Sequence, residues 1–159
     1  MGIKFRDATP YDLEWILLSL RDLDGYFQAR RMFWSNDDHA RESLLELICE
    51  HFFRIAERDG QRQGFIAGRL IPHEYNPRLK TLIEYFWWVI PGIEVRARVG
   101  LALVDEFVTW GKKNADLLIF SIPVSHPVGE GALMRRGFEP WQVDYYLPTN
   151  PTKQAVLNG

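Results

Sequence analysis

The sequence predicts a single α/β domain, built on one mixed and mostly antiparallel sheet of about six to seven strands with helices on both faces. Its 159 residues are close to the commonest size of one domain, and 47% of them are hydrophobic, which is enough for a substantial core. Apolar residues recur in some segments at a spacing of two, typical of strands, and in others at 3.6, typical of helices. We expect the domain to span residues 1–148 and residues 149–159 to form a loose polar tail.

The chain opens with a strand followed by two helices. Residues 3–6 alternate apolar and polar side chains, and the Thr-Pro pair at residues 9–10 is typical of a helix start. Leucine and isoleucine at helical spacing then predict a helix from Tyr11 and a second helix over residues 37–50. We interpret residues 22–34, between the two helices, as a loop or a broken helix.

A tight hairpin is predicted in the middle of the chain. Asp59-Gly60 lies between β-rich runs at residues 53–57 and 64–71, and both central residues of a two-residue hairpin turn must adopt positive φ. The polar stretch that follows, residues 72–80, is interpreted as a loop.

The second half of the chain alternates strands and helices. A β-rich run over residues 82–90 is interpreted as a central strand because Pro91-Gly92 ends it. Residues 97–113 have the clearest helical period, with large apolar side chains on one half and charged ones on the other. The remaining predicted elements are a buried strand at 117–123, a short helix at 127–136 that ends at Gly137, and a final strand at 142–147.

Composition excludes several classes of partner and site. With 19 basic and 21 acidic residues the net charge is −2, so the overall charge does not favour nucleic-acid binding. Cys49 is the only cysteine, which excludes an intramolecular disulfide and a thiolate metal site, and no run is long enough to span a membrane. We expect a reducing, cytoplasmic setting without a membrane partner or a metal. The high aromatic content, 14%, is interpreted as core rather than as a ligand cage.

The most informative segment joins the predicted central strand to the long helix. Free N–H groups at a helix start, the positive end of its dipole and the side chains of Arg96 and Arg98 would meet there, and Gly100 would let an anion approach closely. These features outline a cradle for a pyrophosphate. Taken alone, they fit a solvated, arginine-rich helix entry equally well.

At this segment the chain resembles the GNAT acyltransferase superfamily, which holds acyl-coenzyme A with a motif Arg/Gln-x-x-Gly-x-Gly/Ala. If Gly100 and Ala102 fill the last two positions, Ala97 stands where Arg or Gln is usual; if Arg96 comes first, the glycine positions are not glycine. The spacing around Gly100 is similar to a variant in small bacterial and phage members. The resemblance extends from residues 3–13 to residues 135–140 and includes the order of the elements.

The resemblance implies an acetyl-CoA site between two splayed strands. The strand before the cradle would pair its backbone with the pantetheine arm, and its splayed partner would lie at residues 119–125. The residues that would bind the cofactor are Trp88, Val89, Ile90, Arg96, Ala97, Arg98, Val99, Gly100, Leu101 and Ala102.

Glu84 is the best candidate for a general base. Strict alternation would place it on the same strand face as Phe86, Trp88 and Ile90, where a carboxylate without a purpose is unusual. Some GNAT enzymes carry a glutamate at a similar position, where it deprotonates the acceptor amine. A glutamate that faces solvent or pairs with a basic residue on a neighbouring strand fits the sequence as well.

The general acid of the family is missing from its usual place. Members often carry a tyrosine four residues before the glycine of a Gly-Phe pair, and this position is Leu133 here. Ser125 and His126 are substitute candidates, although a turn residue and a helix-entry residue are the simpler interpretations. A thiolate could also leave unassisted, because thiols have a pKa near 8.5.

The sequence therefore predicts an N-acetyltransferase that uses acetyl-CoA, with direct attack of an amine in a ternary complex. The alternative is a GNAT-fold binding or structural module that has lost catalysis, for example in a phage particle. The acceptor, a small molecule or a protein, is not identified by any motif, and an oligomer is left open. Acidic residues at 22, 24, 37 and 38 could attract a cationic amine or form a solvated rim.

Overall fold

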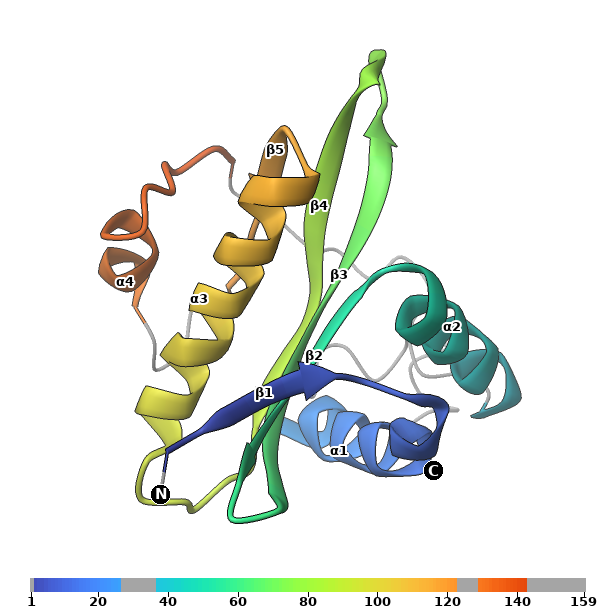
Figure 1. Ribbon diagram of the computed structural model, residues 1–159, viewed down its shortest axis with the longest axis vertical. Coiled ribbons are helices and arrows are strands. Elements are labelled where there is room, and N and C mark those ends of the chain that lie inside the picture. Colours follow the sequence, from blue (N-terminus) through green and yellow to red (C-terminus); the bar gives the residue numbers. More distant parts are fainter. Residues whose placement is uncertain (1, 27–36, 123–128, 143–159) are drawn as a thin grey trace, which may run out of the picture.

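Within the described residues the central sheet has five strands, fewer than the six to seven that the sequence predicts (Figure 1). The computed structural model describes residues 2–26, 37–122 and 129–142. The strands lie in chain order, each antiparallel to the one before it except the last, which is parallel to its neighbour. They are β1 (Lys4–Asp7), β2 (Phe52–Arg58), β3 (Gln61–His73), β4 (Asn76–Val89) and β5 (Leu117–Ile119).

Helices cover both faces of this sheet, as the sequence predicts. The 3-10 helix η1 (Pro10–Asp12) leads into α1 (Leu13–Tyr26), which lies with α2 (Asp37–Glu50) on one face. The long helix α3 (Arg96–Asn114) covers the other face, and the short helix α4 (Glu130–Met134) lies beside it. No described helix is long and apolar enough to cross a bilayer.

Two hydrophobic clusters hold these layers together. Alternate residues of β2 and β3 point to opposite faces, so Phe65 packs under α1 and α2 while Ile66 packs under α3. Trp88 stacks on Phe65 with ring centroids 5.6 Å apart, and Phe52 meets Phe107 of α3 edge to face. These aromatic residues are core, as predicted from composition.

An ion network fixes the start of the chain. Asp12, whose side chain is 1% exposed, accepts hydrogen bonds from both terminal nitrogens of Arg6 at 2.8 Å and from Nε of Arg62 at 2.9 Å. It also accepts bonds from the N–H and the hydroxyl of Thr9, the predicted helix cap. This network ties β1, β3 and the first helical turn together.

The predicted hairpin turn is confirmed, and a second hairpin replaces the predicted loop at residues 72–80. Asp59 and Gly60 have φ of 53° and 76°, as this turn requires. β3 continues to His73 and β4 begins at Asn76, so the supposed loop is a two-stranded arm that projects past the sheet (Figure 1). Polar, exposed strands in such an arm lack the apolar alternation that identifies a buried strand.

Other boundaries also differ from the sequence prediction. α1 continues to Tyr26, whereas a loop or broken helix was predicted from residue 22, and residues 27–36 lie outside the described part. β5 has three residues in place of seven, and it is half-exposed because it lies at an edge among the described strands. The predicted strand at 142–147 lies outside the described residues except for Gln142, which is not in a strand.

Gly64 is required by the close approach of β3 and β4. A Cβ added there would lie 2.5 Å from the carbonyl oxygen of Trp88, which is backbone and cannot rotate away. We expect Gly64→Ala to lower the free energy of unfolding by about 1–3 kcal/mol, measured by urea denaturation. Gly2→Ala, where a Cβ meets nothing within 4 Å, is the control and should leave stability unchanged within about 0.5 kcal/mol.

Candidate functional site

The pairing between β4 and β5 ends before β4 does. The ladder between them covers only three pairs, the last being Ile83 with Ile119, while β4 runs on to Val89. Phe120 follows β5 outside the ladder, and its ring packs edge to face on Trp87 of β4 and on Phe107 of α3. Within the described part of the chain, β4 therefore has an edge beyond Ile83 that β5 does not cover.

The backbone groups of β4 alternate between this edge and β3. The N–H of Ile90 donates to the carbonyl of Gln63 at 2.9 Å, so Ile90, and by alternation Trp88, direct their peptide groups to β3. The peptide groups of Val89 consequently point to the edge that β5 leaves. Of the three residues predicted to pair with a pantetheine arm, Val89 is the one whose backbone is oriented for it. The side chains of Trp88 and Val89 are buried in opposite core clusters.

A β-bulge changes the face on which Glu84 lies. Ala67 faces Phe86 and Gly68 faces Glu84, so Tyr85 is an extra residue in β4. Glu84 therefore shares the α3 face with Leu82, two residues before it, and not the face of Phe86. The predicted grouping of Glu84 with Phe86, Trp88 and Ile90 is wrong, because the bulge inverts the alternation. Glu84 is half-buried beside this bulge.

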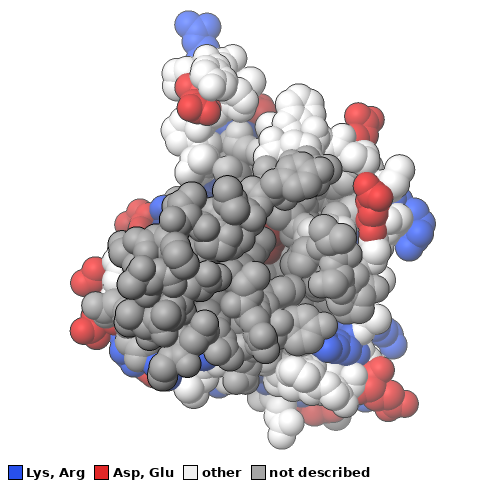
Figure 2. Space-filling model, turned by 180° about the vertical axis from the view of Figure 1, so that it is seen from behind, with Lys and Arg blue, Asp and Glu red and all other residues white. Residues whose placement is uncertain are grey.

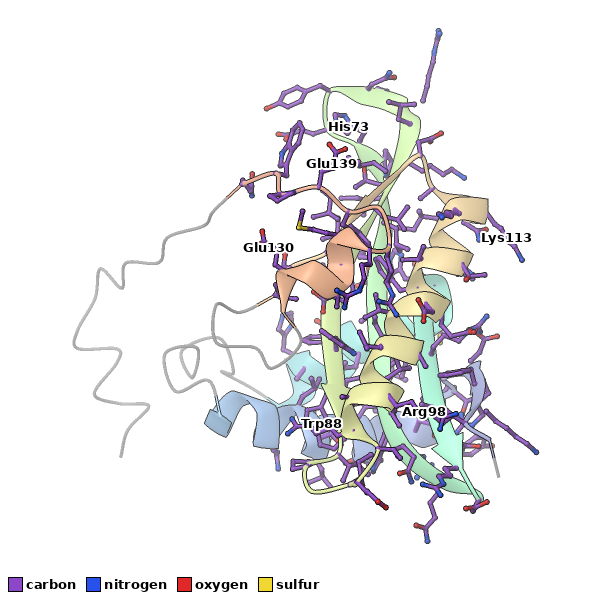
Figure 3. All side chains as sticks on the ribbon, turned by 90° about the vertical axis from the view of Figure 1, so that its left-hand side faces the viewer. His73, Trp88, Arg98, Lys113, Glu130 and Glu139 are labelled. Carbon is purple, nitrogen blue, oxygen red and sulfur yellow. The ribbon has the colours of Figure 1, made fainter. Side chains whose placement is uncertain are left out.

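The first turn of α3 is exposed and basic. Arg96, Ala97 and Arg98 are exposed, the cap residue Val95 makes no side-chain hydrogen bond, and the first turn holds no acidic residue. Helix starts normally attract carboxylates, and two arginines at the positive end of the dipole are unfavourable unless an anion binds there. Figure 3 shows Arg98 at one end of α3 and Lys113 at the other, with Trp88 at the end that carries Arg98.

The structure gives Gly100 a different role from the predicted one. Gly100 is buried, and a Cβ there would lie 3.2 Å from Cζ2 of Trp87 and 3.7 Å from Cγ2 of Val89. The glycine thus lets α3 approach β4 and does not face an anion at the helix start. Val99 is buried as well, while Leu101 and Ala102 are half-buried, so only Arg96, Ala97 and Arg98 of the predicted cradle are exposed. A substitution at Gly100 would test packing before phosphate binding.

Leu133 is part of the packed interior and offers no proton. It is 6% exposed, and its carbonyl accepts the N–H of Phe138 at 3.2 Å after the turn at Gly137. Arg136 holds α4 against α3 through two bonds to the carboxylate of Asp105, at 2.6 and 3.0 Å. Ser125 and His126, the substitute candidates, lie outside the described residues.

One group of side chains has the spacing of a metal site. Ligand atoms of Glu46, Glu50 and His51 lie within 4.8 Å of one another. However, Nδ1 of His51 accepts the N–H of Leu70 at 3.3 Å, which leaves the proton of a neutral ring on Nε2, and Glu46 pairs with Arg69. These partners oppose metal binding, and we assign no metal there.

Charged residues of both signs surround the face opposite to the view of Figure 1. Figure 2 shows acidic and basic side chains interspersed at the margin of this face. The projecting arm carries a basic side chain at its end. The described part of this face thus has no single sign of charge.

Sequence reasoning missed two features of the site. The first is the bulge at Tyr85, for which an irregular alternation along β4 is the only signal in the sequence. The second is Arg58, which lies 40 residues from Arg98 in the sequence, although both residues line a small cavity beside the first turn of α3. A contact at this separation depends on how β2 packs beside α3 and has no local signal.

Comparison with known proteins places the fold. No protein-family model and no curated protein matches the sequence. A transcriptional regulator from Bacillus halodurans C-125 is 13% identical, with a TM-score of 0.72 over 92% of this chain and 99% of its own. An aminoglycoside acetyltransferase, meta-AAC0020 from an uncultured soil metagenomic sample, in complex with sisomicin, is 17% identical, with a TM-score of 0.62 over 93% of this chain and 97% of its own.

A predicted acetyltransferase from Clostridium acetobutylicum, solved with acetyl-CoA, is 17% identical, with a TM-score of 0.60 over 94% of this chain and 96% of its own. Several further solved structures that match over nearly the whole chain are also described as acetyltransferases. At these identities the likeness concerns the fold. The chain has the fold of the GNAT acetyltransferases.

Proposed function

We propose that this protein is an N-acyltransferase that transfers an acetyl group from acetyl-CoA to an amine. The observation that carries the proposal is that the edge of β4 not covered by β5 leads directly into a basic helix start. The ladder between β4 and β5 ends at Ile83, and β4 then leads through Pro91-Gly92 into the exposed first turn of α3. The peptide groups of Val89, which β5 does not reach within the described residues, suit a pantetheine arm, and Arg96 and Arg98 suit its pyrophosphate.

The helix start and the β4 edge would each bind a different part of the cofactor. The N–H groups of Ala97 and Arg98 lie in the first turn, where an α-helix offers them no carbonyl partner. A pyrophosphate would accept these hydrogen bonds and neutralise the arginines, and charge-assisted bonds of this kind are worth roughly 1.5–3 kcal/mol each. The peptide groups of Val89 would meet the amides of the arm as a neighbouring strand does.

In the proposed reaction the neutral amine attacks the thioester carbonyl directly. The new C–N bond forms as the C–S bond breaks, the proton of the amine passes to Glu84 and the thiolate leaves. A half-buried carboxylate beside the β4 bulge is suited to accept this proton, directly or through a water. Because Leu133 cannot donate a proton, the thiolate departs unassisted or receives a proton from a residue other than Leu133, and a thiol pKa near 8.5 makes unassisted departure feasible.

We propose that the acceptor is an amine and that the protein acts in the cytoplasm. The matched aminoglycoside acetyltransferase was solved in complex with sisomicin. A panel of polyamines, aminoglycosides and lysine peptides therefore forms the first screen. Mass spectrometry of the purified protein, in search of bound CoA, is the most direct single test of the cofactor.

A second function is favoured by the buried leucine. A GNAT-fold module that binds CoA without turnover needs no proton donor, and Leu133 supplies none. Binding of CoA without transfer to any amine in the screen would support this module over the enzyme. Transfer to any acceptor would exclude it.

Acetyl-CoA is expected to raise the melting temperature. At a hundredfold excess over Kd, binding adds about 2.7 kcal/mol, which for a domain of this size is roughly 5–10 °C. Arg98→Glu places a negative charge at the helix start and should remove about half of this shift or more, because it weakens pyrophosphate binding at least tenfold. Differential scanning fluorimetry with and without acetyl-CoA measures both effects.

Lys113→Glu is the matched control for this experiment. It makes the same charge reversal at an exposed position at the other end of α3 (Figure 3). The control should keep the full shift. Equal shifts in Arg98→Glu and the wild type would place the pyrophosphate elsewhere, and no shift in the wild type at millimolar acetyl-CoA would refute the cofactor.

A further inference from the structure

A small cavity beside the first turn of α3 brings together two arginines from different elements. It has a volume of about 70 Å³ and is lined by Gly2, Ile3, Arg58, Val95 and Arg98. Pockets for whole small molecules are usually about 300–1,000 Å³, so this cavity has room only for a terminal group of a larger ligand. The glycine, the isoleucine and the valine add no charge to it.

The charges that meet at this cavity are not balanced by close carboxylates. The nearest described partner of Arg58 is Asp59, at 3.8 Å, which is a long distance for an ion pair. Within the described residues Arg98 forms no ion pair, and Glu57, the next acidic residue along β2, is bound by Arg6 at 2.8 Å. Two guanidinium groups that line one cavity repel each other, and Arg98 also lies at the positive end of α3.

We infer that this cavity binds a terminal phosphate monoester, held by Arg58 and Arg98, and that in the cofactor complex this group is the 3′-phosphate of CoA. The inference rests on the proposed function, which places the pyrophosphate at the same helix turn. In CoA a single ribose joins the pyrophosphate to the 3′-phosphate, so the two groups must bind close together. A dianionic monoester would neutralise both arginines, and guanidinium groups bind phosphate through paired N–H donors.

The experiment compares CoA with 3′-dephospho-CoA, which lacks only this phosphate, by isothermal titration calorimetry. The wild type should bind CoA about 10- to 100-fold more tightly than 3′-dephospho-CoA, the range expected for one charge-assisted contact. Arg58→Ala should reduce CoA binding to the level of 3′-dephospho-CoA and leave binding of the latter unchanged. That second affinity also shows that the variant is folded.

Arg78→Ala is the matched control, because Arg78 is exposed on the projecting arm at the opposite end of β4 from the Arg58 turn. It removes the same charge and should keep the full preference for CoA. Equal binding of the two cofactors by the wild type, or a preference that survives in Arg58→Ala, would overturn the inference while the proposed function stands. If neither cofactor binds, the proposed function fails first.

A titration with inorganic phosphate distinguishes two possible ligands of the cavity, the 3′-phosphate of CoA and free phosphate. Suppose that neither cofactor binds. If inorganic phosphate then binds to the wild type at millimolar concentration and does not bind to Arg58→Ala, the ligand of the cavity is free phosphate. Phosphate should compete with CoA and not with 3′-dephospho-CoA if the 3′-phosphate occupies the cavity. Absence of binding by both cofactors and phosphate would leave the cavity without a ligand and refute the inference.

Discussion

Glu84→Gln is expected to lower kcat by about 10²–10⁴-fold while leaving the affinity for acetyl-CoA nearly unchanged. The amide keeps the size and the polar surface of the side chain but cannot accept the proton of the acceptor amine. The change should therefore affect the chemical step and not the cofactor. The readout is acetyl transfer to an amine identified in the screen, with cofactor affinity measured by calorimetry.

Glu50→Gln is the matched control for this variant, because Glu50 is exposed at the end of α2. It should retain the wild-type kcat. A wild-type kcat in Glu84→Gln would show that Glu84 is not the general base. The pH profile adds a second test: a base that titrates in the wild type should give a limb at low pH that the glutamine variant lacks.

Asp12→Ala is expected to lower the free energy of unfolding by about 3 kcal/mol, or roughly 6–12 °C in melting temperature. The carboxylate is buried and accepts hydrogen bonds from Arg6, Thr9 and Arg62, so its loss removes the tie between β1, β3 and the first helical turn. Arg62 also lies over the ring of Trp15 of α1, which packs against the core cluster on that face, and this contact extends the effect into the cluster. Urea denaturation measures the change.

Asp38→Ala serves as the control for this loss, because the Asp38 side chain is 91% exposed and lies 3.8 Å from Arg41. Exposed pairs contribute little, so stability should change by less than about 1 kcal/mol. A similar loss in both variants would mean that burial of the Asp12 network has no particular importance.

The same network predicts how stability depends on pH. Burial raises the pKa of Asp12, but the hydrogen bonds from Arg6 and Thr9 outweigh burial and hold this pKa well below its usual range. A carboxyl whose pKa is lowered by folding stabilises the protein fully above its unfolded pKa of about 3.9, and this contribution is lost as the pH falls toward the folded value. The stability difference between the wild type and Asp12→Asn should thus be about 1 kcal/mol smaller at pH 3 than at pH 7.

Elements that depend on local pattern could be predicted from the sequence alone. The helix at 37–50 has the predicted bounds, and the long helix starts and ends within one residue of the prediction. The turn at Asp59-Gly60 is as predicted, because the φ preferences of single residues determine it. The mixed sheet with helices on both faces follows from the same periodicities. The helices and the turn depend on residues that are close along the chain.

Features of the site that depend on contacts between distant segments were decided by the tertiary structure. One extra residue at Tyr85 moves Glu84 to the other face of β4. A bulge arises from the pairing of two strands, so it cannot be predicted from the alternation of residues within one strand. Gly100 faces Trp87 and Val89 because α3 approaches β4 closely. The sequence predicts that this glycine lets an anion approach, whereas in the structure it lets α3 pack closely on β4. Arg58 and Arg98 line one cavity only because the end of β2 lies beside the start of α3. Local periodicity determines which elements form, whereas packing between them determines which side chains share a site.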